Sequence, residues 1–157
     1  MPCWDQRFQE SEKAYPQIEK DQFHIDILTA HFVQHPDRFD VVVASNLFGD
    51  ILSDLGPAVV GGMGIAGGAN INPEGDYPSM FEPVHGSAPD IAGQNKANPI
   101  ALLLSACLML DHLNEKDISV KIKSAINKTL EQGKYLTGDL GGSSSTTEIT
   151  DAIISNL

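Results

Sequence analysis

The sequence is poor in basic residues, with 10 Lys and Arg against 21 Asp and Glu and a formal net charge of −11. Nucleic-acid backbones are bound through clustered Lys and Arg, so this balance argues against a nucleic-acid partner. The charge does not favour an anionic substrate either. A carboxylate substrate would need a metal ion, or cationic residues that this chain lacks, to neutralise it.

Cysteine and long apolar runs are also scarce. Only Cys3 and Cys107 are present, which argues against a disulfide framework and favours a reducing cytoplasm. No apolar run reaches the roughly eighteen residues of a membrane span, so we expect no membrane association. The opening Met1-Pro-Cys-Trp-Asp5 has no basic region followed by an apolar segment, and we expect no secretory signal. The composition, 41% hydrophobic and 20% charged, is typical of a globular protein with one real core.

Hydrophobic spacing predicts helices that alternate with a few strands. Helices are expected over residues 4–15, 25–33, 100–113, 118–132 and 149–157, and in a segment capped by Ser45 or Asn46. Strands are expected over residues 17–24, 39–44 and 80–84, the second of them buried. A parallel sheet of three strands cannot cover so many apolar helix faces. We therefore expect part of the sheet to lie outside this chain.

Residues at the predicted helix ends agree with this assignment. Asn98 is expected to be an N-cap, with Pro99 at the first helical position. Gly133 is placed to end a helix, and Ser145 with Glu148 forms a capping-box pattern. Residues 56–99 hold most of the glycines and prolines, and a loop region of this length is usually functional.

The stretch Asn46-Leu-Phe-Gly-Asp-Ile-Leu-Ser-Asp54 places two carboxylates one helical turn apart. Asp50 and Asp54 are at positions i and i+4, so on a helix they project from the same face. Their mutual repulsion is relieved by a cation, and Mg²⁺ or Mn²⁺ prefers such oxygen ligands. Carboxylate pairs of this kind are also common on solvated helix faces.

A second stretch, Glu82-Pro-Val-His-Gly-Ser-Ala-Pro-Asp90, lies within the glycine-rich region. Small residues around His85 would let backbone N–H groups approach a ligand. Asp90 is suited to accept hydrogen bonds from ribose hydroxyls, as acidic residues do in other dinucleotide sites. A plain surface loop with a lone histidine is the alternative reading of these residue types.

These two stretches, followed by Gly93-x-x-x-Ala-Asn-Pro99, resemble the β-decarboxylating dehydrogenase family in order and spacing. The family includes isocitrate, 3-isopropylmalate, tartrate and D-malate dehydrogenases. The resemblance extends over nearly the whole chain. Asn70-Ile-Asn-Pro-Glu74, together with the segment from Tyr77 to Pro83 and the opening five residues, is most similar to the tartrate/D-malate branch.

The resemblance implies a role for each matching position. Asp50 and Asp54 would be metal ligands, and Asp26 would be a further metal-site aspartate that one subunit of a homodimer contributes to its partner's site. Read alone, Asp26 is an ordinary carboxylate at a helix start. The adenosine half of the cofactor would be bound by His85, Gly86, Ser87, Ala88, Pro89, Asp90 and Asn98.

The resemblance also indicates the cofactor and the reaction. Asp90 followed by Ile91 resembles the members that use NAD, because a carboxylate at the ribose repels the 2′-phosphate of NADP. The substrate would be a small 2-hydroxy acid. A bound Mg²⁺ or Mn²⁺ would lower the pKa of the substrate hydroxyl, and a general base and a general acid would complete the oxidative decarboxylation.

The implied fold is α/β, of the isocitrate/isopropylmalate dehydrogenase type, but incomplete. Residues 1–60 would be part of the dimer-forming domain, and residues 61–157 part of the cofactor-side domain. The family's catalytic Lys and Tyr and its substrate-binding arginines fall upstream of Met1, so the chain would be a C-terminal half that is inactive alone. Gly67 stands where many relatives have proline, which is expected to loosen a turn.

Alternatives to this reading concern the substrate and the role of the chain. It could be part of a 3-isopropylmalate dehydrogenase, since the residues that distinguish the substrates would lie in the absent half. It could also be a non-catalytic partner that supplies Asp26 to a complete subunit. Exposed apolar faces on residues 100–113 would make the lone chain prone to association.

Overall fold

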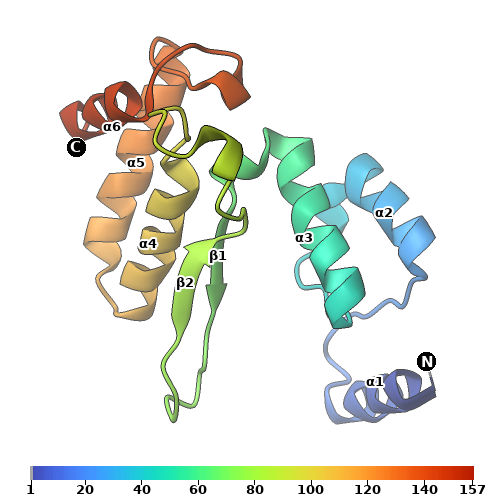
Figure 1. Cartoon of the computed structure of the whole chain (residues 1–157). Helices are drawn as coiled ribbons and strands as arrows, with labels where there is room; N and C mark the ends of the chain where they lie inside the picture. Colours follow the sequence, from blue (N-terminus) through green and yellow to red (C-terminus); the bar gives the residue numbers. More distant parts are fainter. Residues whose placement is uncertain (1) are drawn as a thin grey trace. The chain divides into compact units, whose positions relative to one another are not determined.

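Six α-helices and one antiparallel pair of strands make up the computed structural model, which describes residues 2–157. The helices are α1 Pro2–Ala14, α2 Ile25–Gln34, α3 Asn46–Val60, α4 Ile100–His112, α5 Lys116–Gln132 and α6 Thr146–Ser155, and the strands are β1 Gly67–Asn70 and β2 Met80–Pro83 (Figure 1). The chain divides into two compact units, with the boundary between Asp40 and Val41. Within residues 2–157, no helix is long and apolar enough to cross a membrane.

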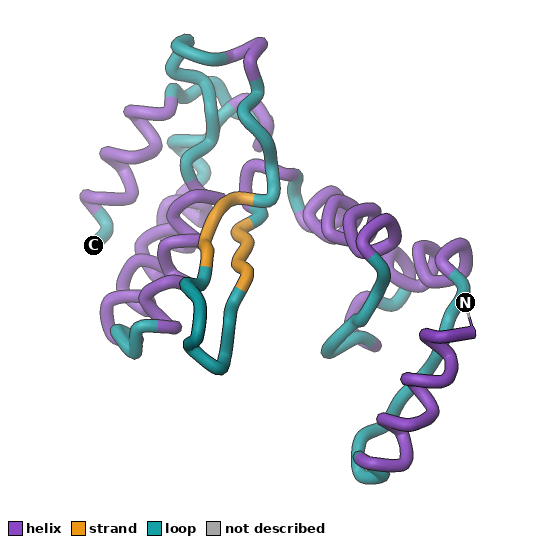
Figure 2. Tube along the Cα trace, turned by 60° about the horizontal axis from the view of Figure 1, so that its bottom comes forward, coloured by secondary structure: helices purple, strands orange, loops and turns teal. Residues whose placement is uncertain are grey.

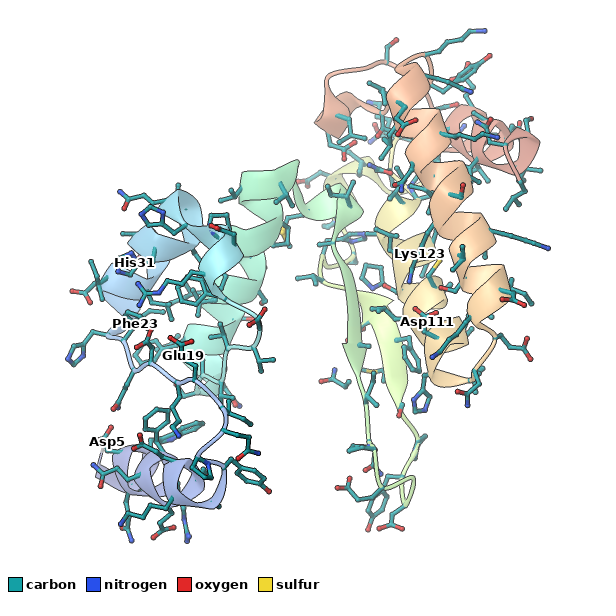
Figure 3. All side chains as sticks on the ribbon, turned by 180° about the vertical axis from the view of Figure 1, so that it is seen from behind. Asp5, Glu19, Phe23, His31, Asp111 and Lys123 are labelled. Carbon is teal, nitrogen blue, oxygen red and sulfur yellow. The ribbon has the colours of Figure 1, made fainter. Side chains whose placement is uncertain are left out.

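The first unit contains α1 and α2, and aromatic side chains gather around α2. The Phe23 ring contacts His31 edge-on at 5.5 Å between ring centres, and Phe39 stacks on Phe32 at 5.2 Å. The guanidinium of Arg38 lies 4.9 Å from the centre of the Phe23 ring. Figure 3 labels Phe23 and His31 in this cluster. The helices expected over residues 4–15 and 25–33 are confirmed.

Two expected strands are absent. Residues 17–24 and 39–44 have no regular secondary structure apart from a turn at Gln17 and bends at Ile18 and Asp40. The second of these segments was expected to be buried, yet Val41 and Val43 are 84% and 80% exposed. A strand requires a neighbouring strand for its backbone hydrogen bonds, and the described part of the chain offers none to either segment. The expectation of strands over residues 17–24 and 39–44 is therefore wrong for this chain.

The second unit is built around α4, α5 and α6. Its core consists of Ile100 on α4, Ala125 and Ile126 on α5, and Ile149 and Ile153 on α6, each at most 3% exposed. Figure 1 shows α4 and α5 side by side, and α6 contacts α5. The expected core helix near residues 100–113 is thus confirmed.

An ion pair joins α4 and α5 at the edge of this core. Lys123 Nζ lies 2.7 Å from Asp111 Oδ2, and Figure 3 shows the two side chains pointing toward one another. The hydrogen bond from Lys123 lowers the pKa of Asp111. Both side chains are partly exposed, so the pair contributes little to stability.

The helix ends follow the expected sequence signals, with one difference. Gly133 ends α5 in the left-handed conformation at φ 64°, and Ser145 with Glu148 forms a complete capping box at the start of α6. Helix α4 begins one residue later than expected, so that Pro99 is the N-cap. The Asn98 side chain still caps the helix, because its Oδ1 accepts a hydrogen bond from the Ile100 N–H at 3.0 Å.

Strands β1 and β2 form a hairpin that packs on α4, with Gly67 opposite Pro83 and Asn70 opposite Met80 (Figure 2). The Gly68 N–H donates to Ser105 Oγ of α4 at 3.2 Å. A Cβ on Gly67 would lie 2.9 Å from Leu104 Cβ, closer than real Cβ atoms approach. Gly67 is therefore a close-packing position in a strand, which corrects the expectation of a loosened turn.

Helix α3 extends further into the glycine-rich region than the sequence indicates. It contains Gly56 and Pro57 and ends at Gly61, whose φ of 141° is strained for other residues. Strand β1, made largely of glycine and alanine, was not expected at all. The strand expected over residues 80–84 is confirmed as β2.

Candidate functional site

Helix α3 carries both aspartates of the candidate metal site. Asp50 and Asp54 are exposed and lie four residues apart on this helix, whereas Leu52 between them is only 5% exposed. Neither carboxylate forms an ion pair or a side-chain hydrogen bond within residues 2–157. Their oxygens are therefore available to a hard divalent cation, and this donor set fits Mg²⁺ or Mn²⁺.

Asp26 lies in the first turn of α2, in the first unit. Its side chain is exposed, and Oδ1 accepts a hydrogen bond from the Ile27 N–H at 2.9 Å. That contact is an ordinary one for an acidic residue at a helix start, and it engages only one carboxylate oxygen. In the described part of the chain, no three His, Cys, Asp or Glu side chains gather as a metal-binding group.

Residues 85–90 form a turn that follows β2. His85 is partly buried, and its Nδ1 lies 2.9 Å from the Gly86 carbonyl oxygen. Ala88 adopts a left-handed conformation with φ 43°, and a short 3-10 helix, Pro89–Ile91, follows it. Asp90 is exposed, and its backbone carbonyl accepts a hydrogen bond from Gln94 Nε2 at 2.7 Å. Its carboxylate accepts no hydrogen bond from the described residues.

Asn98 differs from the other candidate cofactor residues because it is buried, at 9% exposure. Its Nδ2 donates to Asp139 Oδ2 at 2.9 Å, while its Oδ1 caps α4. The amide therefore joins the start of α4 to the loop that precedes α6. This contact gives Asn98 a structural role, whatever it contributes to ligand binding.

Further polar residues, which the sequence did not indicate, connect the end of the loop of residues 85–98 to the start of α6. Asn95 Oδ1 accepts hydrogen bonds from the backbone and the hydroxyl of Thr147 at 3.2 and 3.0 Å. The Thr146 N–H donates to the Asn95 carbonyl at 2.9 Å, and its hydroxyl donates to the Ala97 carbonyl at 2.5 Å. The start of α6 thus positions the loop that contains the candidate nucleotide residues.

An open apolar groove of about 670 Å³ lies elsewhere in the second unit. Its lining residues come mainly from α3, from β1 with the turn before it, and from α4: Leu52, Ser53, Gly56, Pro57, Val60, Ile65, Ala66, Gly67, Val84, Leu104, Leu108 and Lys123. None of the candidate metal or nucleotide residues is among them. The groove is an uncovered apolar surface, distinct from the residues that could carry the chemistry.

Comparison with known proteins identifies the class of protein to which this chain belongs. Residues 1–153 match the family described as isocitrate/isopropylmalate dehydrogenase, and the chain belongs to this family. Its structure is also similar to that of the TT0538 protein from Thermus thermophilus, with a TM-score of 0.91 and 44% identity over 98% of this chain and 31% of that one. The expected family and fold are confirmed.

Among the relatives, a probable tartrate dehydrogenase/decarboxylase of Bacillus subtilis (strain 168) is 54% identical over 100% of this chain. A D-malate dehydrogenase (decarboxylating) of Escherichia coli (strain K12) is 53% identical over 98%, and a 3-isopropylmalate dehydrogenase of Thermobifida fusca (strain YX) is 54% identical over 96%. This chain spans 44%, 44% and 41% of their respective lengths and matches their C-terminal part.

Proposed function

We propose that this chain is the C-terminal part of an NAD-dependent, divalent-metal-dependent dehydrogenase that oxidatively decarboxylates a small 2-hydroxy acid of the tartrate/D-malate type. The observation that carries the proposal is the pair Asp50 and Asp54, two exposed and unpaired carboxylates on one helix of a chain in this family. Residues 1–60 would belong to the dimer-forming domain, and residues 61–157 to the cofactor-side domain. The setting would be the cytoplasm.

In this proposal, Asp50 and Asp54 hold Mg²⁺ or Mn²⁺ together with the Asp26 that a second subunit of a homodimer contributes. When bound, the ion would polarise the 2-hydroxyl of the substrate and stabilise the negative charge that develops on its oxygen. The second oxygen of Asp26, which accepts no hydrogen bond here, would remain free for this contact.

Residues 85–90 would bind the adenosine half of NAD. The exposed Asp90 carboxylate would accept hydrogen bonds from the ribose hydroxyls and repel the 2′-phosphate of NADP. His85, Gly86, Ser87, Ala88 and Pro89 would line the adenosine around it, and Asn98 would fix the far end of the loop. The hydrogen bonds of Asn95 to the start of α6 support this arrangement, because they order the loop before a ligand arrives.

The general base and general acid would come from outside this chain. We therefore expect the 157-residue chain alone, given NAD, Mn²⁺ and either D-malate or tartrate, to produce no measurable NADH. Production of NADH by the purified chain would contradict that part of the proposal. Binding of this chain to a separate, complete subunit would favour the alternative of a non-catalytic partner. Catalysis by a single longer chain that includes these residues would count against it.

The metal site can be tested by Mn²⁺ titration of the chain followed by NMR. Paramagnetic broadening should affect the backbone amides of α3 around Asp50 and Asp54 at lower Mn²⁺ concentrations than those around Asp117 and Asp151. The double substitution Asp50→Asn/Asp54→Asn should abolish this difference. The control Asp117→Asn/Asp151→Asn removes two exposed carboxylates from α5 and α6 and should leave it intact. Equal broadening at all four positions in the wild type would contradict the proposal.

The substrate is less narrowly defined. Identities of 53–54% to the tartrate, D-malate and 3-isopropylmalate relatives do not separate the three activities. The segments at Asn70 and Tyr77 favour the tartrate/D-malate type, and 3-isopropylmalate is the second candidate. Comparing the kcat/KM of the three acids in an assembled enzyme would decide between them.

A further inference from the structure

The loop of residues 85–98 has a backbone conformation that two of its residues do not favour. Ala88, Gly93 and Asn95 all have a positive φ, at 43°, 73° and 56° respectively. Glycine adopts this left-handed region freely, whereas alanine does so at a cost, and asparagine tolerates it somewhat better. A conformation of this kind persists only where the surrounding structure imposes it. The contacts between the loop and the rest of the unit therefore show what imposes it.

These contacts are concentrated at the start of α6. Asn95 Oδ1 accepts hydrogen bonds from the N–H and the hydroxyl of Thr147, which is 52 residues further along the chain. The Asn95 carbonyl oxygen accepts another from the Thr146 N–H. The start of α6 is itself fixed, because the capping box closes its first turn and Ile149 is fully buried in the core. Asn95 thus joins the loop to an ordered part of the unit.

A second contact extends this link to Asp90. Gln94, the residue before Asn95, donates a hydrogen bond from Nε2 to the Asp90 carbonyl oxygen at 2.7 Å. The Asp90 carboxylate accepts no hydrogen bond from the described residues, so its position depends on the backbone that carries it. Gln94 and Asn95 therefore form a continuous link from α6 to the carboxylate that the proposed function assigns to the ribose.

We propose that Asn95 is a positioning residue for the bound nucleotide, because its contacts with α6, together with the bond from Gln94, fix the place of Asp90. This inference rests on the proposed nucleotide site. Asn95 acts without touching the cofactor, since it reduces the ordering of the loop that binding would otherwise require. The coupling is reciprocal, so a bound nucleotide should in turn stabilise the contact between Asn95 and Thr147.

The sequence provides a matched set of variants. Asn95→Gly removes both side-chain hydrogen bonds but introduces a residue that adopts a positive φ without strain. Asn114→Gly is the control, because Asn114 is exposed, has a φ of 64° and forms no side-chain hydrogen bond within residues 2–157. Asn95→Asp keeps the oxygen acceptor and should restore the contact. Asn95 and Asn114 are both exposed, so all three variants should keep the wild-type circular dichroism spectrum.

Hydrogen exchange without any ligand tests the link itself. In the 157-residue chain, the amides of Thr147 and of residues 90–94 should exchange about fivefold or more faster in Asn95→Gly than in the wild type. Asn114→Gly and Asn95→Asp should keep the wild-type rates at these positions. Addition of adenosine should slow exchange of the Thr147 amide in the wild type and have less effect on it in Asn95→Gly.

NMR titration with adenosine tests the consequence for binding. Adenosine is uncharged, so the added charge of Asn95→Asp does not repel it. The Kd obtained from the shifts of residues 85–90 should rise about fivefold or more in Asn95→Gly. It should stay within about twofold of the wild-type value in Asn95→Asp and in Asn114→Gly.

A second ligand separates positioning of Asp90 from a general loss of stability. In the wild type, the Asp90 carboxylate should disfavour adenosine 2′-monophosphate relative to adenosine, because it repels the phosphate. The ratio of the two Kd values should fall in Asn95→Gly, since Asp90 is then less well fixed. A general loss of stability would weaken both ligands equally and leave the ratio unchanged.

The possible failures can be told apart. Equal exchange rates, equal adenosine affinities or an equal Kd ratio in the wild type and Asn95→Gly would overturn this inference and leave the nucleotide site standing. The same changes in Asn114→Gly would also overturn it, because they would not depend on the contact with α6. A wild-type chain that does not bind adenosine would contradict the nucleotide site of the proposed function, and this inference with it.

Discussion

Residues 61–157 bury far more of their apolar side chains than residues 2–60 do. The buried apolar residues of the later region are Ala66, Ile100, Ala101, Cys107, Ala125, Ile126, Ile149, Ala152 and Ile153. Those described in the earlier region are Leu28 and Leu52. The later region contains a core of its own, whereas the earlier one holds the candidate metal residues on helices whose apolar faces lack cover. The candidate metal residues are thus located in the region that buries the fewest apolar side chains.

The largest expected effect tests this contrast directly. Ile126→Ala removes a side chain that is 2% exposed from the centre of the core, and it should lower the free energy of unfolding by about 2–5 kcal/mol. The matched change Ile51→Ala, on α3 at 45% exposure, should cost less than about 1 kcal/mol, because less apolar surface is lost. Urea denaturation followed by circular dichroism measures both. Similar costs at the two positions would show that α3 has a core as complete as that of α4–α6.

A smaller effect concerns the packing of β1 on α4. Gly67→Ala would place a Cβ 2.9 Å from both Leu104 Cβ and the Ser105 backbone nitrogen, and the resulting overpacking should cost about 1–3 kcal/mol. Gly138→Ala is the control, since a Cβ there meets nothing within 4 Å and should change the stability by less than about 0.5 kcal/mol. Thermal melts of the two variants provide the comparison. A neutral Gly67→Ala would mean that the hairpin is free to move away from α4.

The smallest effect is a pH dependence at the start of α6. Hydrogen bonds from the backbone N–H and the hydroxyl of Ser145 lower the pKa of Glu148 below its ordinary value of 4.5. Because the pKa is lower in the folded state, the stabilisation is fully present above the ordinary value and is lost as the pH falls through the folded value. Glu148→Gln can keep the capping geometry but does not titrate.

Melting temperatures measured from neutral pH down to about pH 3 should therefore converge for the wild type and Glu148→Gln at the acid end. The control Glu131→Gln removes an exposed carboxylate from α5 and should not reproduce this convergence. A constant difference across the whole range would show that the charge of Glu148 does not contribute to the cap.

The helices could be predicted from the sequence because their signals are local. A periodic apolar face together with Gly133, or with the Ser145–Glu148 pair, specifies a helix and its end within a few residues. The motifs at Asp50 and Asp90 and the segment from Gly93 to Pro99 are local as well, and together they indicate the family. The helix signals and the motifs both depend only on residue types at short separations in the sequence.

The errors arose where structure depends on distant residues. Residues 39–44 have the composition of a strand, but a strand forms only beside a partner, and composition does not reveal whether one is present. Strand β1 shows the opposite error, since it is present although no strand was expected there. Its glycines have low β-propensity, but they are needed for close contact with α4. Asn98 was assigned to ligand binding as well as to a helix cap, but its partner Asp139 lies 41 residues further along the chain and gave no local signal.

The two cysteines differ in their accessibility to thiol reagents. Cys3 is exposed on α1, whereas Cys107 is fully buried on α4, with its sulfur 3.8 Å from the Ser119 carbonyl oxygen. Burial raises the pKa of the Cys107 thiol and so diminishes its reactive thiolate form. A thiol reagent added to the native protein would consequently attach a fluorophore or spin label to α1 alone. The rate at which Cys107 is modified would be much lower, and it would report how often α4 transiently separates from α5.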